Sequence, residues 1–236
     1  MTAVEEHRAA LREMPASEVR AYLSSRSGLP GPRANLELMG AFADVAPEPL
    51  VRELAGDDDE YLRCCGTVGL GRLLGERSAD QRSELFAVLH ARAADASWRV
   101  REAAAMGLQR LGDVDADGLR SVVAVWATDE HPLVRRAAIA GICEPRLLRD
   151  ESTARAALDA CAEATSSLAA VPASQRRDRD VRTLRKALGY CWSVAVAALP
   201  DEGLPRFAAL AGSTDPDVAW VVRENRGKAR LRRLLE

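Results

Sequence analysis

Apolar residues recur at spacings of three and four positions through much of this 236-residue chain, in stretches separated by short polar segments. Within 79–94, for example, Leu85, Val88 and Leu89 form one apolar stripe, while polar side chains such as Arg82 can face water. This period predicts amphipathic α-helices that bury one face. The stretches that we assign to outer helices are 47–55, 79–94, 115–127, 151–170 and 203–212.

A seven-residue motif that opens with Asp and closes with a basic residue occurs five times between these stretches. It occupies 57–63, 95–101, 129–135, 180–186 and 217–223. Successive closing bases are 38, 34, 51 and 37 residues apart, and a period in the thirties is typical of stacked helix pairs. The sequence therefore predicts an all-α fold, a right-handed α-solenoid of about five HEAT-like helix pairs, with an inner helix beginning at each motif.

Glycine also recurs at a fixed position in these predicted inner helices. Gly69, Gly107 and Gly141 each lie six residues beyond a closing base. Glycine inside a helix costs about 1 kcal/mol relative to alanine, so its recurrence indicates places where a neighbouring helix approaches closely.

The charged ends of the motifs have two interpretations. The Asp carboxylate can accept hydrogen bonds from free amide groups where a helix begins, and each base can reach an Asp of its own or the adjacent repeat, which makes a ladder. Alternatively, the bases line the concave inner-helix surface and bind an acidic ligand. The five bases are Arg63, Arg101, Arg135, Lys186 and Arg223.

We interpret residues 1–236 as a single solenoid in which residues 1–40 form an N-terminal helical cap with a Pro/Gly turn and residues 41–236 form the repeats. After Pro30, Gly31 and Pro32, which enforce the turn, Asn35 is placed to cap a helix. Arg33 beside that helix start is either an anion-binding candidate or part of a plain connector.

A basic loop near 172–180 interrupts the repeats. Its Arg176, Arg177 and Arg179 are further anion-binding candidates, and a simply solvated loop is the alternative. The final segment 223–236 is also basic and reads either as a polar cap of the solenoid or as a surface for DNA or an acidic protein.

Composition narrows the class of protein. The chain is 47% hydrophobic, 29% charged and only 4% aromatic, with a net charge of −2, which does not fit a general nucleic-acid binder. The five cysteines include no CxxC pair, the three histidines lie far apart, and neither a signal peptide nor a long apolar run is present. We therefore expect a reduced, cytoplasmic protein without a metal, cofactor or membrane segment.

With the Asp-to-base motifs, the alanine pairs that follow them and the shared glycine in view, the chain resembles the HEAT-repeat superfamily over roughly residues 40–236. The resemblance implies a scaffold or adaptor whose concave face binds a partner protein. HEAT-like relatives also include phycobilin lyase subunits, although no residue here points to tetrapyrrole handling.

Two segments are similar to the HEAT-like alkylpurine DNA glycosylases: VRRAAIAG at 134–141, together with Trp126, and WVVREN at 220–225. That resemblance implies a base-facing Trp220 and a phosphate contact from Arg135 or Arg136. The family's catalytic Asp follows a Trp pair, whereas this chain keeps Trp98 and has Ala103 at the Asp position. It therefore implies DNA binding without efficient base excision.

The favoured function is a non-catalytic scaffold that binds a partner protein through its concave face, and DNA binding or repair is the alternative. For the four tryptophans, packing between helices is the alternative to ligand contact. The candidate binding residues are Arg63, Trp98, Arg101, Arg135, Arg136, Lys186, Trp220 and Arg223.

Overall fold

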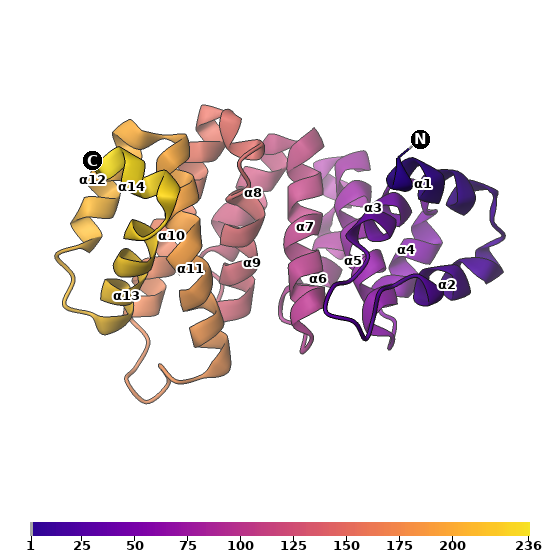
Figure 1. Ribbon diagram of the computed structural model, residues 1–236, viewed down its shortest axis with the longest axis horizontal. Helices are drawn as coiled ribbons and strands as arrows, with labels where there is room; N and C mark the ends of the chain where they lie inside the picture. Colours follow the sequence, from indigo (N-terminus) through magenta and orange to yellow (C-terminus); the bar gives the residue numbers. More distant parts are fainter. Residues whose placement is uncertain (1) are drawn as a thin grey trace. The chain divides into compact units, whose positions relative to one another are not determined.

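The computed structural model describes residues 2–236, and over this range it contains α-helices, two short 3-10 turns and no strand (Figure 1). The predicted all-α class is confirmed. The chain divides into two compact units, Met1–Val114 and Asp115–Glu236, each with its own core. The interpretation of one array with an N-terminal cap stays a prediction, as does its right-handedness.

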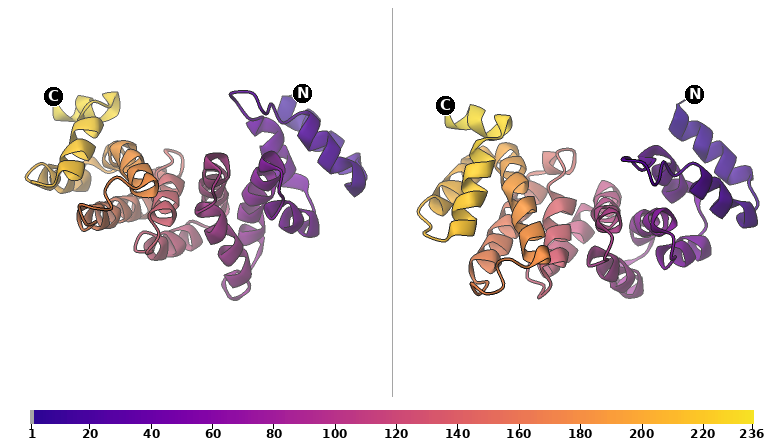
Figure 2. Two further views of the ribbon diagram at one scale, coloured as in Figure 1. Left: turned by 90° about the horizontal axis from the view of Figure 1, so that it is seen from below. Right: turned by 60° about the horizontal axis from the view of Figure 1, so that its bottom comes forward.

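The first unit contains seven α-helices and the 3-10 turn Ala79–Gln81. These helices are α1 (Ala3–Glu13), α2 (Ala16–Ser25), α3 (Leu36–Val45), α4 (Glu48–Ala55), α5 (Glu60–Glu76), α6 (Ser83–Ala93) and α7 (Trp98–Val114). Helix α5 is central, because it packs against α3, α4 and α7 (Figure 2).

The second unit also contains seven α-helices, with the 3-10 turn Leu147–Arg149. They are α8 (Ala116–Trp126), α9 (Pro132–Ile142), α10 (Glu151–Ala169), α11 (Arg179–Ala198), α12 (Pro200–Leu210), α13 (Pro216–Arg226) and α14 (Ala229–Leu235). Here α11 is central and packs against α9, α10 and α13. No helix among residues 2–236 combines the length and the apolar character needed to span a bilayer.

The five predicted outer helices are confirmed as α4, α6, α8, α10 and α12, and each is followed by an inner helix that carries or closely follows an Asp-to-base motif. One detail was wrong. Arg82 does not face water but is buried, with its Nε donating to the Arg77 carbonyl at 2.9 Å. The N-terminal prediction holds at Asn35, whose side chain accepts from the Leu38 amide at 3.0 Å and caps α3.

The opening Asp of the first three motifs lies two residues before the helix cap, not at the cap as predicted. Asp57, Asp95 and Asp129 each accept a hydrogen bond of 2.8 Å from the amide two residues further on. This local turn orders the entry to the helix, and the next polar side chain caps it. The caps are Asp59 for α5, Ser97 for α7 and His131 for α9.

In the last two motifs the opening Asp lies inside the helix. Asp180 is in the first turn of α11, after the N-cap Asp178. Asp217 is in the first turn of α13, where Asp215 is the cap and accepts from the amides of Asp217 and Val218. The same spacing from Asp to base therefore occurs with two different positions of the Asp relative to the start of the helix.

Close helix contacts at glycine are confirmed in the first unit. A Cβ on Gly69 would lie 2.9 Å from Cγ1 of Val51 on α4, and one on Gly107 would lie 3.2 Å from the Thr67 carbonyl oxygen. The tightest approach between the inner helices α5 and α7 is at Gly71, which is not one of the glycines that recur six residues beyond a closing base. There, a Cβ would lie 2.1 Å from the Gly107 carbonyl oxygen.

Candidate functional site

Arg63 in α5 is engaged on both sides of its guanidinium. Its Nε pairs with Asp95 of the next motif at 3.1 Å, and its Nη1 donates to the Asp57 carbonyl at 2.5 Å. The side chain is 16% exposed. These contacts tie the entry loop of α5 to the following repeat, and they favour the ladder role over ligand binding.

Arg101 repeats the same loop contact one repeat later. It is 6% exposed, and its Nη1 donates to the carbonyls of Asp95 at 2.6 Å and Ala96 at 2.9 Å. As with Arg63, the first acceptor belongs to the Asp that opens the motif. The hydrogen bond from the closing Arg to the carbonyl of the opening Asp therefore recurs in both motifs. It joins the two ends of the loop that leads into the helix, and this structural role explains why the motif is repeated.

In α9, Arg136 is also buried, at 8% exposure. Arg135 is half-buried and lines a hollow of about 490 Å³ beside His131 and the segment 170–175. Its Nε is shielded from solvent and has no hydrogen-bond acceptor in the described part of the chain. Of these two candidates, only Arg135 faces an open space.

The fourth motif uses Arg185 rather than Lys186 for its ladder contact. Arg185 Nη1 pairs with Asp217 at 2.5 Å, and this pair is 32 residues apart in sequence, as Arg63 and Asp95 are. Lys186 is exposed. The expectation that Lys186 closes the ladder was wrong because α11 begins one residue before Asp180, which turns Arg185 toward α13.

The basic loop splits its three arginines between two environments. Arg176 pairs with Asp215 at 2.6 Å and Asp217 at 3.3 Å and donates to the Ala169 carbonyl at 3.2 Å, whereas Arg177 and Arg179 are exposed. Arg176 is therefore committed to the chain's own carboxylates. Partial burial raises the pKa of Asp215, but Arg176 and two helix amides outweigh it and hold that pKa below its usual range.

Three of the four tryptophans contact neighbouring helices or side chains. Trp126 and Trp192 are buried, and Trp192 Nε1 donates to Thr165 Oγ1 at 2.9 Å. Trp220 is half-buried, with Arg185 over its ring at 4.7 Å and its edge against Gly189. These positions fit the packing interpretation.

Trp98 is different, because 53% of it is exposed at the start of α7. It lines an apolar pocket of about 330 Å³, which we call the Trp98 pocket, between the 32–34 segment, the start of α3 and one face of α7. Leu36 on the opposite wall is 58% exposed. The full lining is Pro32, Arg33, Ala34, Leu36, Met39, Trp98, Arg99, Glu102, Ala103 and Met106.

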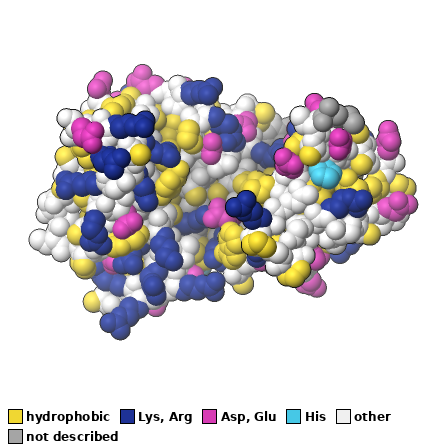
Figure 3. Space-filling view, in the orientation of Figure 1, with side chains coloured by type: hydrophobic (Ala, Val, Ile, Leu, Met, Phe, Trp, Pro, Cys, Tyr) yellow, Lys and Arg dark blue, Asp and Glu magenta, His cyan; other side chains and the backbone are white. Residues whose placement is uncertain are grey.

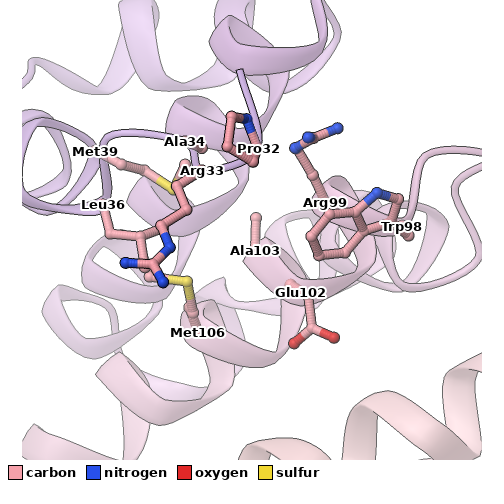
Figure 4. Close-up of a pocket in the computed structure, with 10 residues that line it drawn as sticks. All are labelled: Pro32, Arg33, Ala34, Leu36, Met39, Trp98, Arg99, Glu102, Ala103 and Met106. Carbon is pink, nitrogen blue, oxygen red and sulfur yellow. The ribbon is translucent and has the colours of Figure 1, made fainter. Parts of the chain in front are cut away.

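Figure 4 shows how the walls of the Trp98 pocket are arranged. The Trp98 indole stands on one side, Leu36, Arg33 and Met106 stand on the other, and Ala103 lies between them. The small side chain of Ala103 leaves the space open. Arg33 and Trp98, which the sequence offered for unrelated reasons, therefore belong to one site.

Hydrogen bonds and one ion pair hold the Trp98 wall in place. Ser97 Oγ accepts from the Arg99 amide at 3.1 Å and donates to Glu60 Oε1 at 2.5 Å, which fixes the beginning of α7. Arg99 pairs with the same carboxylate at 3.1 Å and covers one face of the indole, with its Cζ 4.8 Å from the ring centroid. Because this network sets the orientation of Trp98, the opposite face of the ring is presented in a defined direction.

The sequence alone did not predict this pocket, because its two walls come from segments about sixty positions apart in the chain. Met39, Met106 and Leu36 carry no motif, and at the sequence level each reads as an ordinary core position. The signals were the Trp98 side chain, in a chain that is poor in aromatics, and Arg33 as a candidate for anion binding.

Ala103 occupies the position where the glycosylase resemblance would require Asp, and it has no group that stabilises a cation. Glu102 also lines the pocket. Across residues 2–236, no group of three or more His, Cys, Asp or Glu side chains is arranged to hold a metal ion.

These paired helices, with their recurring entry loops, define a repeat protein of the α-solenoid class. Residues 47–143 match a family model described as HEAT repeats, a span of less than half the chain that supports a place in the HEAT-type repeat superfamily. No curated protein matches, so the glycosylase resemblance gains no support.

The solved structures that match this chain include designed repeat proteins. Two crystal structures of engineered proteins are 18% and 16% identical, with TM-scores of 0.37 and 0.39, and the matches cover 95% of this chain and 95% and 97% of theirs. A designed armadillo repeat protein in complex with the peptide (KR)4 is 15% identical, with a TM-score of 0.38 and coverage of 95% of this chain and 98% of that one.

Proposed function

We propose that this protein is a non-catalytic HEAT-type scaffold that binds a partner protein, and that the Trp98 pocket is a principal contact. One observation supports this proposal above the others. Two large apolar side chains, Trp98 and Leu36, are each more than half exposed, and both line the same apolar pocket. Burying apolar surface gives about 25 cal/mol per Å², so a partner that covers both would gain substantially.

The pocket suits an apolar side chain of a partner. Its volume of about 330 Å³ is at the small end of ligand sites, and its lining is almost entirely apolar. Tryptophan is enriched among the residues that dominate binding energy at protein interfaces. Arg33 and Glu102 also line the pocket and Arg99 is paired with Glu60, so we expect the contact with the partner to be mainly apolar.

A cytoplasmic location is part of the proposal. All five cysteines are free thiols buried in the two units, which fits a reducing compartment. The other inner-helix candidates, Arg63 and Arg101, contribute by holding the helix-entry loops rather than by touching the partner.

Site-specific photo-cross-linking tests the proposal. A benzophenone amino acid in place of Leu36 captures the partner in cells, and the identified partner is then purified and titrated against the whole chain. We expect Trp98→Ala to weaken binding at least about tenfold, in the range of interface hot spots. Melting temperature and circular dichroism should be unchanged, since Trp98 is exposed.

Val125→Ser is the matched control, because Val125 in α8 is 67% exposed and apolar but does not line the pocket. It should leave the affinity unchanged. Equal binding by wild-type protein and Trp98→Ala would show that the partner uses another surface, and the proposal would be abandoned.

A further inference from the structure

The second unit carries basic side chains that the ladder does not use. Arg182 and Lys186 on α11 and Arg223 and Arg226 on α13 are all exposed. None of the four has an ion pair with any carboxylate in the described range. Their neighbours Arg176 and Arg185, in contrast, are paired with Asp215 and Asp217.

These unpaired cations lie on adjacent helices. Arg182 and Lys186 are one turn apart on α11, and α11 packs against both α13 and α14. Figure 3 shows Lys and Arg side chains gathered over this part of the second unit, with few acidic side chains between them. We call the surface formed by Arg182, Lys186, Arg223, Arg226 and Arg230 the basic face.

Two aromatic rings lie within the basic face, and each already has a guanidinium over it. Tyr190 is 46% exposed, and Arg230 lies 5.0 Å from its ring centroid and donates to its hydroxyl at 2.9 Å. Trp220 has Arg185 at 4.7 Å. The contact with Tyr190 orients Arg230 without neutralising its charge, whereas Arg185 is already paired with Asp217.

We infer that the basic face binds an acidic segment of a partner polypeptide, independently of the Trp98 pocket. Unpaired guanidinium and ammonium groups on a folded surface attract carboxylates, and arginine binds them with paired hydrogen bonds. The cations lie on three neighbouring helices, α11, α13 and α14, rather than at one point. An extended segment with several Asp or Glu residues can therefore engage them together.

Three observations favour an acidic polypeptide over a nucleic acid. One face of each of the Tyr190 and Trp220 rings is covered by arginine, which reduces the aromatic surface on which bases could stack. Glu224 of α13 lies against α11, with its Cβ 3.4 Å from where a Cβ of Gly189 would be, and a polypeptide can place an uncharged residue opposite this carboxylate, whereas a nucleic acid carries a phosphate at every step. The whole chain has a net charge of −2, which disfavours a long polyanion more than a short segment.

Fluorescence anisotropy with the whole protein tests the inference. The probe is a short labelled peptide that alternates Glu and Ser, at about 50 mM salt where screening is weak. We expect binding that weakens as salt increases, no binding of the same peptide with Gln in place of Glu, and at least about tenfold weaker binding by Lys186→Glu/Arg223→Glu. Both residues are exposed, so the variant should fold normally.

The matched control is Arg12→Glu, which reverses an exposed charge on α1 in the first unit. It should bind the Glu peptide as the wild type does. Equal binding by the double variant and the wild type would overturn the inference, and so would tighter binding of a short labelled DNA duplex than of the Glu peptide at the same salt. Neither result would affect the Trp98 pocket, which is measured with a different partner and a different variant.

Discussion

Arg185 and Lys186 are neighbours in sequence with opposite environments. Arg185 pairs with Asp217, stacks on Trp220 and has an Nε buried away from solvent. Lys186 is exposed and has no ion pair in the range that the structure covers. A single step along α11 therefore separates a side chain that joins two helices from one that is available to a partner.

We expect Arg185→Ala to lower the free energy of unfolding by about 1–3 kcal/mol, because it removes a hydrogen-bonded partner from the buried Asp217. Lys186→Ala should change the free energy of unfolding by less than about 0.5 kcal/mol, as an exposed surface substitution does. Urea denaturation followed by circular dichroism measures both. If the two variants lose equal stability, the assignment of Arg185 to the ladder is wrong.

The same residue-scale distinction explains what the sequence predicted about the motifs and what it did not. The spacing from Asp to base correctly indicated a repeated structural link, seen at Arg63 and Arg101. It misplaced the helix start, because an Asp can accept from an amide two residues ahead in a turn as readily as it can cap a helix. The same spacing wrongly predicted that Lys186, rather than Arg185, makes the ladder contact, because a spacing counted in residues cannot show where a helix begins.

At the scale of helices, the crossing of α5 and α7 depends on glycine at both contact points. A Cβ on Gly71 would lie 2.1 Å from the Gly107 carbonyl oxygen, and this neighbour is backbone that no rotamer change can move. The two inner helices therefore pack with their backbones in contact, which brings Met106 and Ala103 of α7 into position in the Trp98 pocket.

Gly71→Ala should be destabilising although alanine has the higher helix propensity. We expect a loss of about 1–3 kcal/mol or more, because the two helices must separate to admit the methyl group. Gly56→Ala is the control, since a Cβ there would make only an ordinary contact at 3.6 Å and Gly56 has a negative φ of −102°. Thermal denaturation compares the two, and a Gly71→Ala protein as stable as the wild type would contradict the close crossing.

The helices themselves were the most predictable level, since each outer and inner segment follows from the apolar period and the recurring motif. Gly71 was missed because the recurring glycines mark only positions shared among repeats, whereas the Gly71 contact is particular to α5 and α7. The Trp98 pocket was missed for a related reason. The pocket depends on how α7 packs against the 32–34 segment, and local sequence patterns do not predict this tertiary packing.

At the scale of the whole molecule, the reactivity of the five cysteines can show whether each of the two cores is closed. Cys64 and Cys65 are buried in the first unit, and Cys143, Cys161 and Cys191 in the second. Burial, followed by the nearby Glu60 carboxylate, raises the pKa of the Cys64 thiol to about 12. Burial raises the pKa of Cys65 well above its ordinary range, and a hydrogen bond with Cys161 does the same for Cys143.

Because only the thiolate reacts, and because all five thiols are buried and those of Cys64, Cys65 and Cys143 have raised pKa values, alkylation by N-ethylmaleimide should require each unit to open. We expect slow labelling at neutral pH that accelerates up to about pH 8.5, the ordinary thiol pKa, where thiols in the opened chain become ionised. A folded pKa above the unfolded value contributes stability that is complete below about pH 8.5 and is lost as the pH rises toward the folded pKa. Peptide mass spectrometry gives one rate for Cys64 and Cys65 and another for the second-unit thiols, and labelling in denaturant is the control. Rapid labelling of native protein at neutral pH would show that these thiols are not in closed cores.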